Sequence, residues 1–163
     1  MRKIKFSNEF DYVLSWFTSI GYFSTHFKNI LVIKNIHQAL KTGGILILDI
    51  NNFSKTLHNM KLRTHPEWTL VPEYSSVYEL SDGTRIKKVS KFDRMKRKLS
   101  TLLEWTKDGR DKKMHYEVRL FPYDEIITLL QGIGFKILQT WGSNLGEEFS
   151  DTSPRLIIKA QKI

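Results

Sequence analysis

The sequence predicts an α/β protein into which an antiparallel β-meander is inserted. Three observations support this fold class. An aromatic and β-branched run at residues 10–17 precedes a helical pattern, and the apolar run 45–50 follows that pattern. Strand-like segments separated by turns then occupy much of residues 76–121, and helix and strand patterns return after Pro122.

The first part reads as one strand–helix–strand unit. Residues 25–41 place Ile33, Ile36 and Leu40 at helical spacing, Thr25 is suited to cap the helix start, and the glycine pair 43–44 is expected to stop the helix. The run 45–50 is almost continuously apolar, which is typical of a strand covered on both faces. The loops between these strands and the helix are short, which predicts a right-handed crossover between two parallel strands.

The middle of the chain changes in character. The polar region after Asn52, with prolines at 66 and 72, is expected to hold a short helix and a loop. Two of the turns between the strands predicted in this region, at residues 81–84 and 107–110, contain Asp-Gly, which is a strong hairpin signal. The predicted strands are 76–80, 85–93, 99–106 and 112–121.

A helix is predicted after Pro122, with acidic residues in its first turn and an end at residues 132–134. Ile126, Leu129 and Leu130 form its apolar face. Strands are expected at 135–141 and 156–160. We therefore predict one domain over residues 1–163, with an α/β core at 1–52 and 122–163 and the meander at 70–121.

Composition narrows the classes of function. The chain has no cysteine, which excludes a disulfide scaffold, a thiolate zinc site and a cysteine nucleophile. Its five histidines lack metal-ligand spacing, so no metal is predicted. No apolar stretch is long enough to cross a bilayer, and we expect a soluble cytoplasmic protein.

The net charge of +9 raises the question of an acidic partner. The positive charge is concentrated between residues 85 and 113, on what read as solvated strand faces and turns. No nucleic-acid-binding module is recognisable, so we favour a solvated face over a nucleic-acid footprint.

Three segments agree with a known pattern, in chain order: Phe10-Asp11-Tyr12-Val13, Leu40-Lys41-Thr42-Gly43-Gly44-Ile45-Leu46-Ile47-Leu48-Asp49 and Leu130-Gln131-Gly132-Ile133-Gly134-Phe135. Together they resemble the "FDxV", "LKPGGxLxxD" and "LLxxxGF" segments of class I S-adenosylmethionine-dependent methyltransferases. Thr42 stands where that family usually has proline. The resemblance covers nearly the whole chain, and the ending from Ser153 to Ile158 is similar to a small-molecule branch with an inserted meander.

The resemblance implies the C-terminal part of a seven-stranded Rossmann-like sheet. Residues 10–17 and 45–50 would be its fourth and fifth strands, and the last two runs would be the sixth and seventh. Strands one to three would be missing, together with the glycine-rich turn and the ribose-binding acid that hold the cofactor. Met1 and Arg2 look like a segment that relatives precede with an adenine-binding Asp. We therefore expect a truncated enzyme in which S-adenosylmethionine binding is weak or absent.

Candidate site residues follow from the resemblance and from strand ends, where open α/β sheets bind ligands. The cofactor candidates are Met1, Ser15, Trp16, Phe17 and Gly21. The substrate candidates are Tyr22, Asp49, Asn51, Asn52, Arg119 and Arg155. Simpler interpretations stand beside these: the aromatic residues could be core, Asp49 a turn cap and the arginines surface residues. No catalytic residue is identified.

The favoured function is methyl transfer to a small-molecule acceptor. One alternative is a non-catalytic module that binds a second copy or a partner chain through an exposed sheet edge. A second alternative is a basic nucleic-acid-binding protein, for which charge is the only argument. Neither interpretation requires a membrane.

Overall fold

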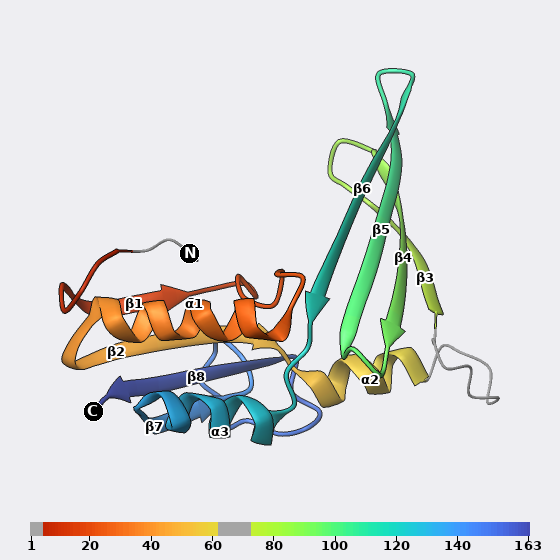
Figure 1. Cartoon of the computed structure of the whole chain (residues 1–163). Helices are drawn as coiled ribbons and strands as arrows, with labels where there is room; N and C mark the ends of the chain where they lie inside the picture. Colours follow the sequence, from red (N-terminus) through yellow and green to blue (C-terminus); the bar gives the residue numbers. More distant parts are fainter. Residues whose placement is uncertain (1–4, 62–72) are drawn as a thin grey trace. The chain divides into compact units, whose positions relative to one another are not determined.

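A computed structural model describes residues 5–61 and 73–163 of the chain (Figure 1). The chain divides into two compact units. The first contains residues 1–56 and 120–163, and the second contains residues 57–119. The predicted Met1 site lies outside the described residues. No helix in the described ranges is long and apolar enough to span a membrane.

The first unit is built on a four-stranded sheet with the order β1-β2-β8-β7. Its elements are β1 (Phe10–Ser15), α1 (His26–Ala39), β2 (Leu40–Asn51), α3 (Tyr123–Ile133), β7 (Phe135–Trp141) and β8 (Arg155–Lys162). β1 and β2 are parallel, while β8 is antiparallel to both β2 and β7. The predicted strand–helix–strand order is confirmed, and the expected last two strands are present.

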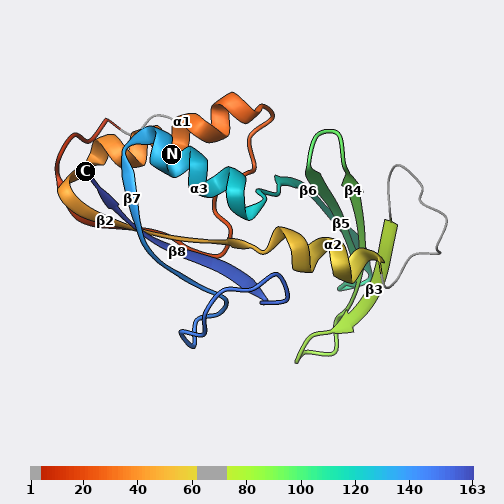
Figure 2. The ribbon, with the colours of Figure 1, turned by 90° about the horizontal axis from the view of Figure 1, so that it is seen from below.

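The core of this unit lies on one face of the sheet. α1 and α3 lie over the same side of the strands (Figure 2). Leu46, Leu48 and Ile50 point to that side and are at most 2% exposed. On the opposite face, Ile45 and Ile47 are only partly buried and Leu14 is 68% exposed. The expectation that residues 45–50 are covered on both faces is therefore wrong for the described residues.

The glycine pair 43–44 has a different role from the one predicted. α1 is capped by Thr25, as expected, because its hydroxyl accepts a hydrogen bond from the Lys28 amide at 3.3 Å. The helix ends earlier, at Ala39, and both glycines lie inside β2. The register with β1 shifts at this point, and Gly43 has φ +80°. The pair thus shapes a strand irregularity instead of a helix end.

α3 agrees closely with its prediction. Asp124 and Glu125 occupy its first turn, and Ile126 and Leu130 are fully buried. The helix ends at Gly134, which has φ +109°. A side chain there would also be obstructed, since an added Cβ would lie 2.9 Å from His37 Nε2.

α2 (Phe53–Lys61) begins the polar middle region, and the second unit carries a separate antiparallel sheet. Its strands pair in chain order: β3 (Glu73–Glu79), β4 (Arg85–Asp93), β5 (Lys98–Lys107) and β6 (Arg110–Arg119). Gly83 and Gly109 have φ of +80° and +67°, as the Asp-Gly turns require. Phe92 and Val118 are buried, and Ser90 and Thr101 pair their hydroxyls at 3.2 Å between the strands.

Candidate functional site

The chain makes an unusual turn where β1 ends. Phe17 and Thr18 both have left-handed backbone conformations, with φ of 54° and 56°. Such conformations cost of the order of 1–3 kcal/mol each in non-glycine residues, and they are rarest for β-branched residues such as Thr18. This turn explains why β1 ends at Ser15, two residues before the predicted strand end.

Asp49 of β2 holds this turn. The Phe17 amide donates a hydrogen bond to Asp49 Oδ2 at 2.9 Å, and the Thr18 amide donates to the Asp49 carbonyl oxygen at 2.9 Å. Asp49 itself is 2% exposed. The carboxyl ends of the parallel strands β1 and β2 are thereby tied together.

Arg155, the first residue of β8, completes this arrangement. Its Nε donates to Asp49 Oδ1 at 2.8 Å, and its two terminal nitrogens donate to Asn51 Oδ1 at 2.6 Å and to Thr18 Oγ1 at 2.8 Å. The guanidinium offsets the buried charge of Asp49. We call Thr18, Asp49, Asn51 and Arg155 the clamp.

The clamp brings together three predicted substrate residues and adds one that was not predicted. Asp49, Asn51 and Arg155 lie together, although more than 100 positions separate Arg155 from the other two. Both Asp49 carboxylate oxygens already accept hydrogen bonds, which fits a structural carboxylate better than a free base. Thr18 was missed because nothing in its local sequence indicates a left-handed turn.

Aromatic side chains are exposed beside the clamp. Phe17 is 80% exposed and Trp16 is 37% exposed, so neither is a core aromatic residue. Their rings meet edge to face at a centroid distance of 6.1 Å. Gly21, with φ +103°, and the exposed Tyr22 follow in the loop before α1. Exposed aromatic side chains at the carboxyl end of a sheet can pack against a ligand that binds there.

Ser15 and Asn52 are buried and bonded within the protein. The Ser15 hydroxyl pairs with the Ser19 hydroxyl at 3.0 Å. The Asn52 side-chain amide lies within hydrogen-bond distance of the carbonyl oxygens of Ser150, Asp151 and Ser153, at 2.8–3.2 Å. Asn52 therefore anchors the loop before β8. A contact between Asn52 and a substrate would require this anchor to open.

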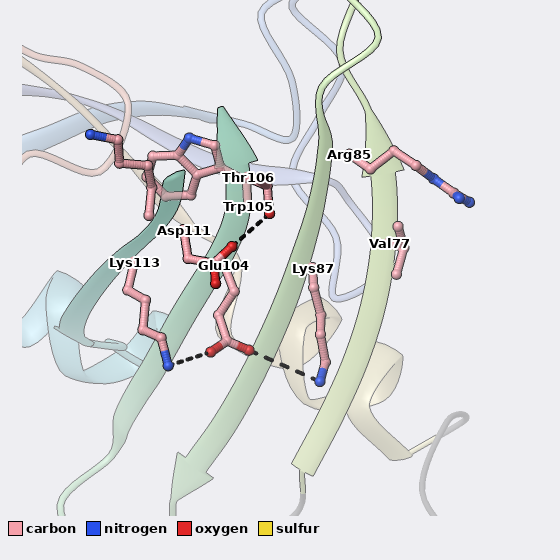
Figure 3. Close-up of a pocket in the computed structure, with 9 residues that line it drawn as sticks. Val77, Arg85, Lys87, Glu104, Trp105, Thr106, Asp111 and Lys113 are labelled. Carbon is pink, nitrogen blue, oxygen red and sulfur yellow. Dashed lines mark hydrogen bonds and ion pairs between the residues drawn. The ribbon is translucent and has the colours of Figure 1, made fainter. Parts of the chain in front are cut away.

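Arg119 lies in the second unit, where its Nη1 donates to the Lys96 carbonyl oxygen at 3.4 Å. A hollow of about 520 Å³ lies on the polar face of the same sheet (Figure 3). Within it, Glu104 lies between Lys87 and Lys113, at 4.0 Å and 3.0 Å. Thr106 also donates to Asp111 at 2.8 Å.

Cross-strand pairs continue along this sheet, because Lys91 contacts Glu73 at 2.7 Å and Lys98 contacts Glu117 at 3.0 Å. The basic segment thus uses many of its charges within its own sheet. In the described part of the chain, no group of three or more metal-ligand side chains is found.

No family model matches the sequence. A protein of Bacillus subtilis (strain 168) named "Putative methyltransferase YqeM" is 26% identical over 165 residues, which cover 99% of this chain and 63% of the relative. The chain therefore spans less than two thirds of the length of that protein.

Solved structures agree in fold. The CcbJ methyltransferase from Streptomyces caelestis matches with a TM-score of 0.79 and 15% identity, over 96% of this chain and 62% of its own. An S-adenosylmethionine-dependent methyltransferase from Clostridium acetobutylicum ATCC 824 matches with a TM-score of 0.79 and 16% identity, over 99% of this chain and 61% of its own.

A third structure is CalS10, an amino pentose methyltransferase from Micromonospora echinaspora described as bound to S-adenosylmethionine. Its TM-score is 0.61 at 16% identity, over 99% of this chain and 62% of its own. The curated relative and the common fold of these neighbours agree with the three sequence segments. The chain is thus similar in sequence to a putative methyltransferase and similar in fold to S-adenosylmethionine-dependent methyltransferases.

Proposed function

We propose that the chain forms part of an S-adenosylmethionine-dependent methyltransferase that acts on a small-molecule acceptor. The observation that carries this proposal is the site at the carboxyl ends of β1 and β2. There a strained turn presents two exposed aromatic rings beside a buried polar cluster. Ligands of open α/β sheets bind outside the carboxyl ends of the strands.

The sheet supports a more detailed assignment. We assign β1, β2, β7 and β8 to the fourth, fifth, sixth and seventh strands of a seven-stranded sheet, and the second unit to an inserted meander. The outer edge of β1 has no strand partner within residues 5–61 and 73–163, which leaves room for further strands. In this assignment, residues outside this chain or in a partner chain supply strands one to three.

For the cofactor, we propose contacts with Ser15, Trp16, Phe17 and Gly21. In the described residues, no glycine-rich turn joins a strand to a helix, which is where nucleotide-binding α/β sheets place the turn that approaches the cofactor. We therefore expect the isolated chain to bind S-adenosylmethionine weakly.

For the acceptor, we propose a contact with Tyr22, which is 47% exposed and is the most accessible of the predicted substrate residues at this end of the sheet. A small acceptor is supported by neighbours described as an amino pentose methyltransferase and a sugar N-methyltransferase. The reaction would move a methyl group from the sulfonium to a nucleophile in line, while the protein positions both groups and excludes water.

Calorimetry of S-adenosylmethionine with the purified chain tests this proposal, with ATP as a control that shares the adenosine and carries more negative charge. We expect saturable binding with a Kd of about 0.1–1 mM, corresponding to about 4–5.5 kcal/mol, and clearly weaker binding of ATP. Absence of binding at millimolar ligand, or equal binding of ATP, would contradict a specific cofactor site in this chain.

A further inference from the structure

Arg155 satisfies three acceptors that come from separate parts of the first unit. Its nitrogens bond Asp49 and Asn51 on β2 and Thr18 in the turn after β1. A planar guanidinium has fixed donor directions and can serve all three at once, whereas a lysine ammonium is a compact point charge on a flexible stem. The geometry therefore depends on arginine and not merely on positive charge.

The turn needs this support because its backbone is strained. Phe17 and Thr18 are adjacent left-handed residues, and neither is glycine. Their amides are held by the side chain and the carbonyl group of Asp49. Asp49 is buried, so its carboxylate needs a close countercharge to keep its position. Arg155 supplies that charge and also holds the Thr18 hydroxyl.

We propose that Arg155 is a positioning residue for the cofactor site: through Asp49 and Thr18 it fixes the strained turn that presents Trp16 and Phe17. This inference rests on the proposed function. It assigns Arg155 no contact with the acceptor and no role in the chemical step. Its side chain is a quarter exposed and its donors are directed into the protein.

The test compares Arg155→Met and Arg155→Lys with Lys159→Met, which removes a cation from the same face of β8. Amide hydrogen exchange of Phe17 and Thr18 reports the turn, and calorimetry reports S-adenosylmethionine affinity. We expect at least tenfold faster exchange and at least tenfold weaker binding in both Arg155 variants, beyond any change in global stability. Lys159→Met should match the wild type in both measurements.

Thr18→Val covers the case in which the Arg155 variants fail to fold. It keeps the Asp49–Arg155 ion pair and removes only the hydroxyl acceptor, and we expect several-fold faster exchange of the two turn amides. The inference would be overturned if the two turn amides of Thr18→Val exchanged at the wild-type rate. It would also be overturned if Arg155→Lys showed both the wild-type exchange rates and the wild-type affinity for S-adenosylmethionine.

The two proposals can fail separately. If the wild-type chain binds no S-adenosylmethionine, the proposed function of this chain fails. The exchange rates still decide whether Arg155 holds the turn, because they require no ligand. If the wild type binds and Arg155→Lys binds equally well, only the positioning role is overturned.

Discussion

Asn52 shows how one buried side chain can fix a loop far away in sequence. Its amide lies close to three carbonyl oxygens of residues 150–153. We expect Asn52→Asp to lower the free energy of unfolding by about 3 kcal/mol at pH 7, because a buried carboxylate would face oxygens that lose their donor. Urea unfolding measures the difference.

The matched control is Asn144→Asp in the exposed loop after β7, which we expect to change stability by less than about 0.5 kcal/mol. Equal stability of the two variants would show that the Asn52 anchor is not required. It would also return Asn52 to the residues available for a substrate.

His37 is expected to make the stability of the fold depend on pH. Burial, and then the nearby Lys162 ammonium, lower the pKa of His37, whose ring packs edge to face on Phe135. Below its ordinary pKa of about 6.5, the unfolded chain gains a proton at His37 that the folded chain does not take up. Stability from this residue is therefore present above about pH 6.5 and is lost as the pH falls toward the lowered pKa.

His37→Gln should therefore flatten the loss of stability as the pH falls below about 6.5. The measurement is the urea midpoint at several pH values. A slope in His37→Gln as steep as in the wild type would assign the pH dependence to other groups.

At the level of residues, the sequence predicted which residues belong to the site better than it predicted what each of them does there. The sequence predicts Asp49, Asn51 and Arg155 as substrate contacts, and the structure brings these three residues together. Their hydrogen bonds to one another, and to Thr18, depend on how β8 pairs with β2. That pairing joins residues about 100 positions apart, so local patterns could not show which partners each group would find.

Among the elements, β1 carries three exposed large apolar side chains, those of Phe10, Tyr12 and Leu14. Tyr12 and Leu14 are both 68% exposed, and the outer edge of β1 is unpaired in the described ranges. Such an edge promotes association with other strands. We expect the wild-type chain to self-associate and Leu14→Lys to reduce this, with stability changed by less than about 0.5 kcal/mol, as measured by sedimentation velocity.

Leu145→Lys places the same charge on an exposed loop residue, where Leu145 is 81% exposed. It should leave association unchanged. A monomeric wild type, or equal effects of the two substitutions, would remove β1 as an interaction edge.

Helices and strands were predictable mainly where periodicity and turn chemistry agreed. The start of α1 at Thr25 and the end of α3 at Gly134 follow from cap chemistry. The glycine pair 43–44 was misassigned because a helix end and a strand irregularity both call for glycine. Coverage of the sheet faces was also mispredicted, because an apolar strand pattern does not show whether helices cover its second face.

For the whole molecule, the sequence predicted where positive charge is concentrated but not how it is used. Glu104 lies between Lys87 and Lys113 only because three strands pair in one register. Three short segments carried the resemblance to methyltransferases, whereas the structure showed that the ends of β1 and β2 lie together. We propose that the carboxyl ends of β1 and β2 form the cofactor site.

The most direct test is a residue-resolved nuclear magnetic resonance titration of the 163-residue chain with S-adenosylmethionine. We predict amide shift changes concentrated at residues 15–22 and at Asn51, with the strands β3–β6 unaffected. Shift changes confined to the basic second sheet, or no changes at millimolar ligand, would contradict a cofactor site at these strand ends.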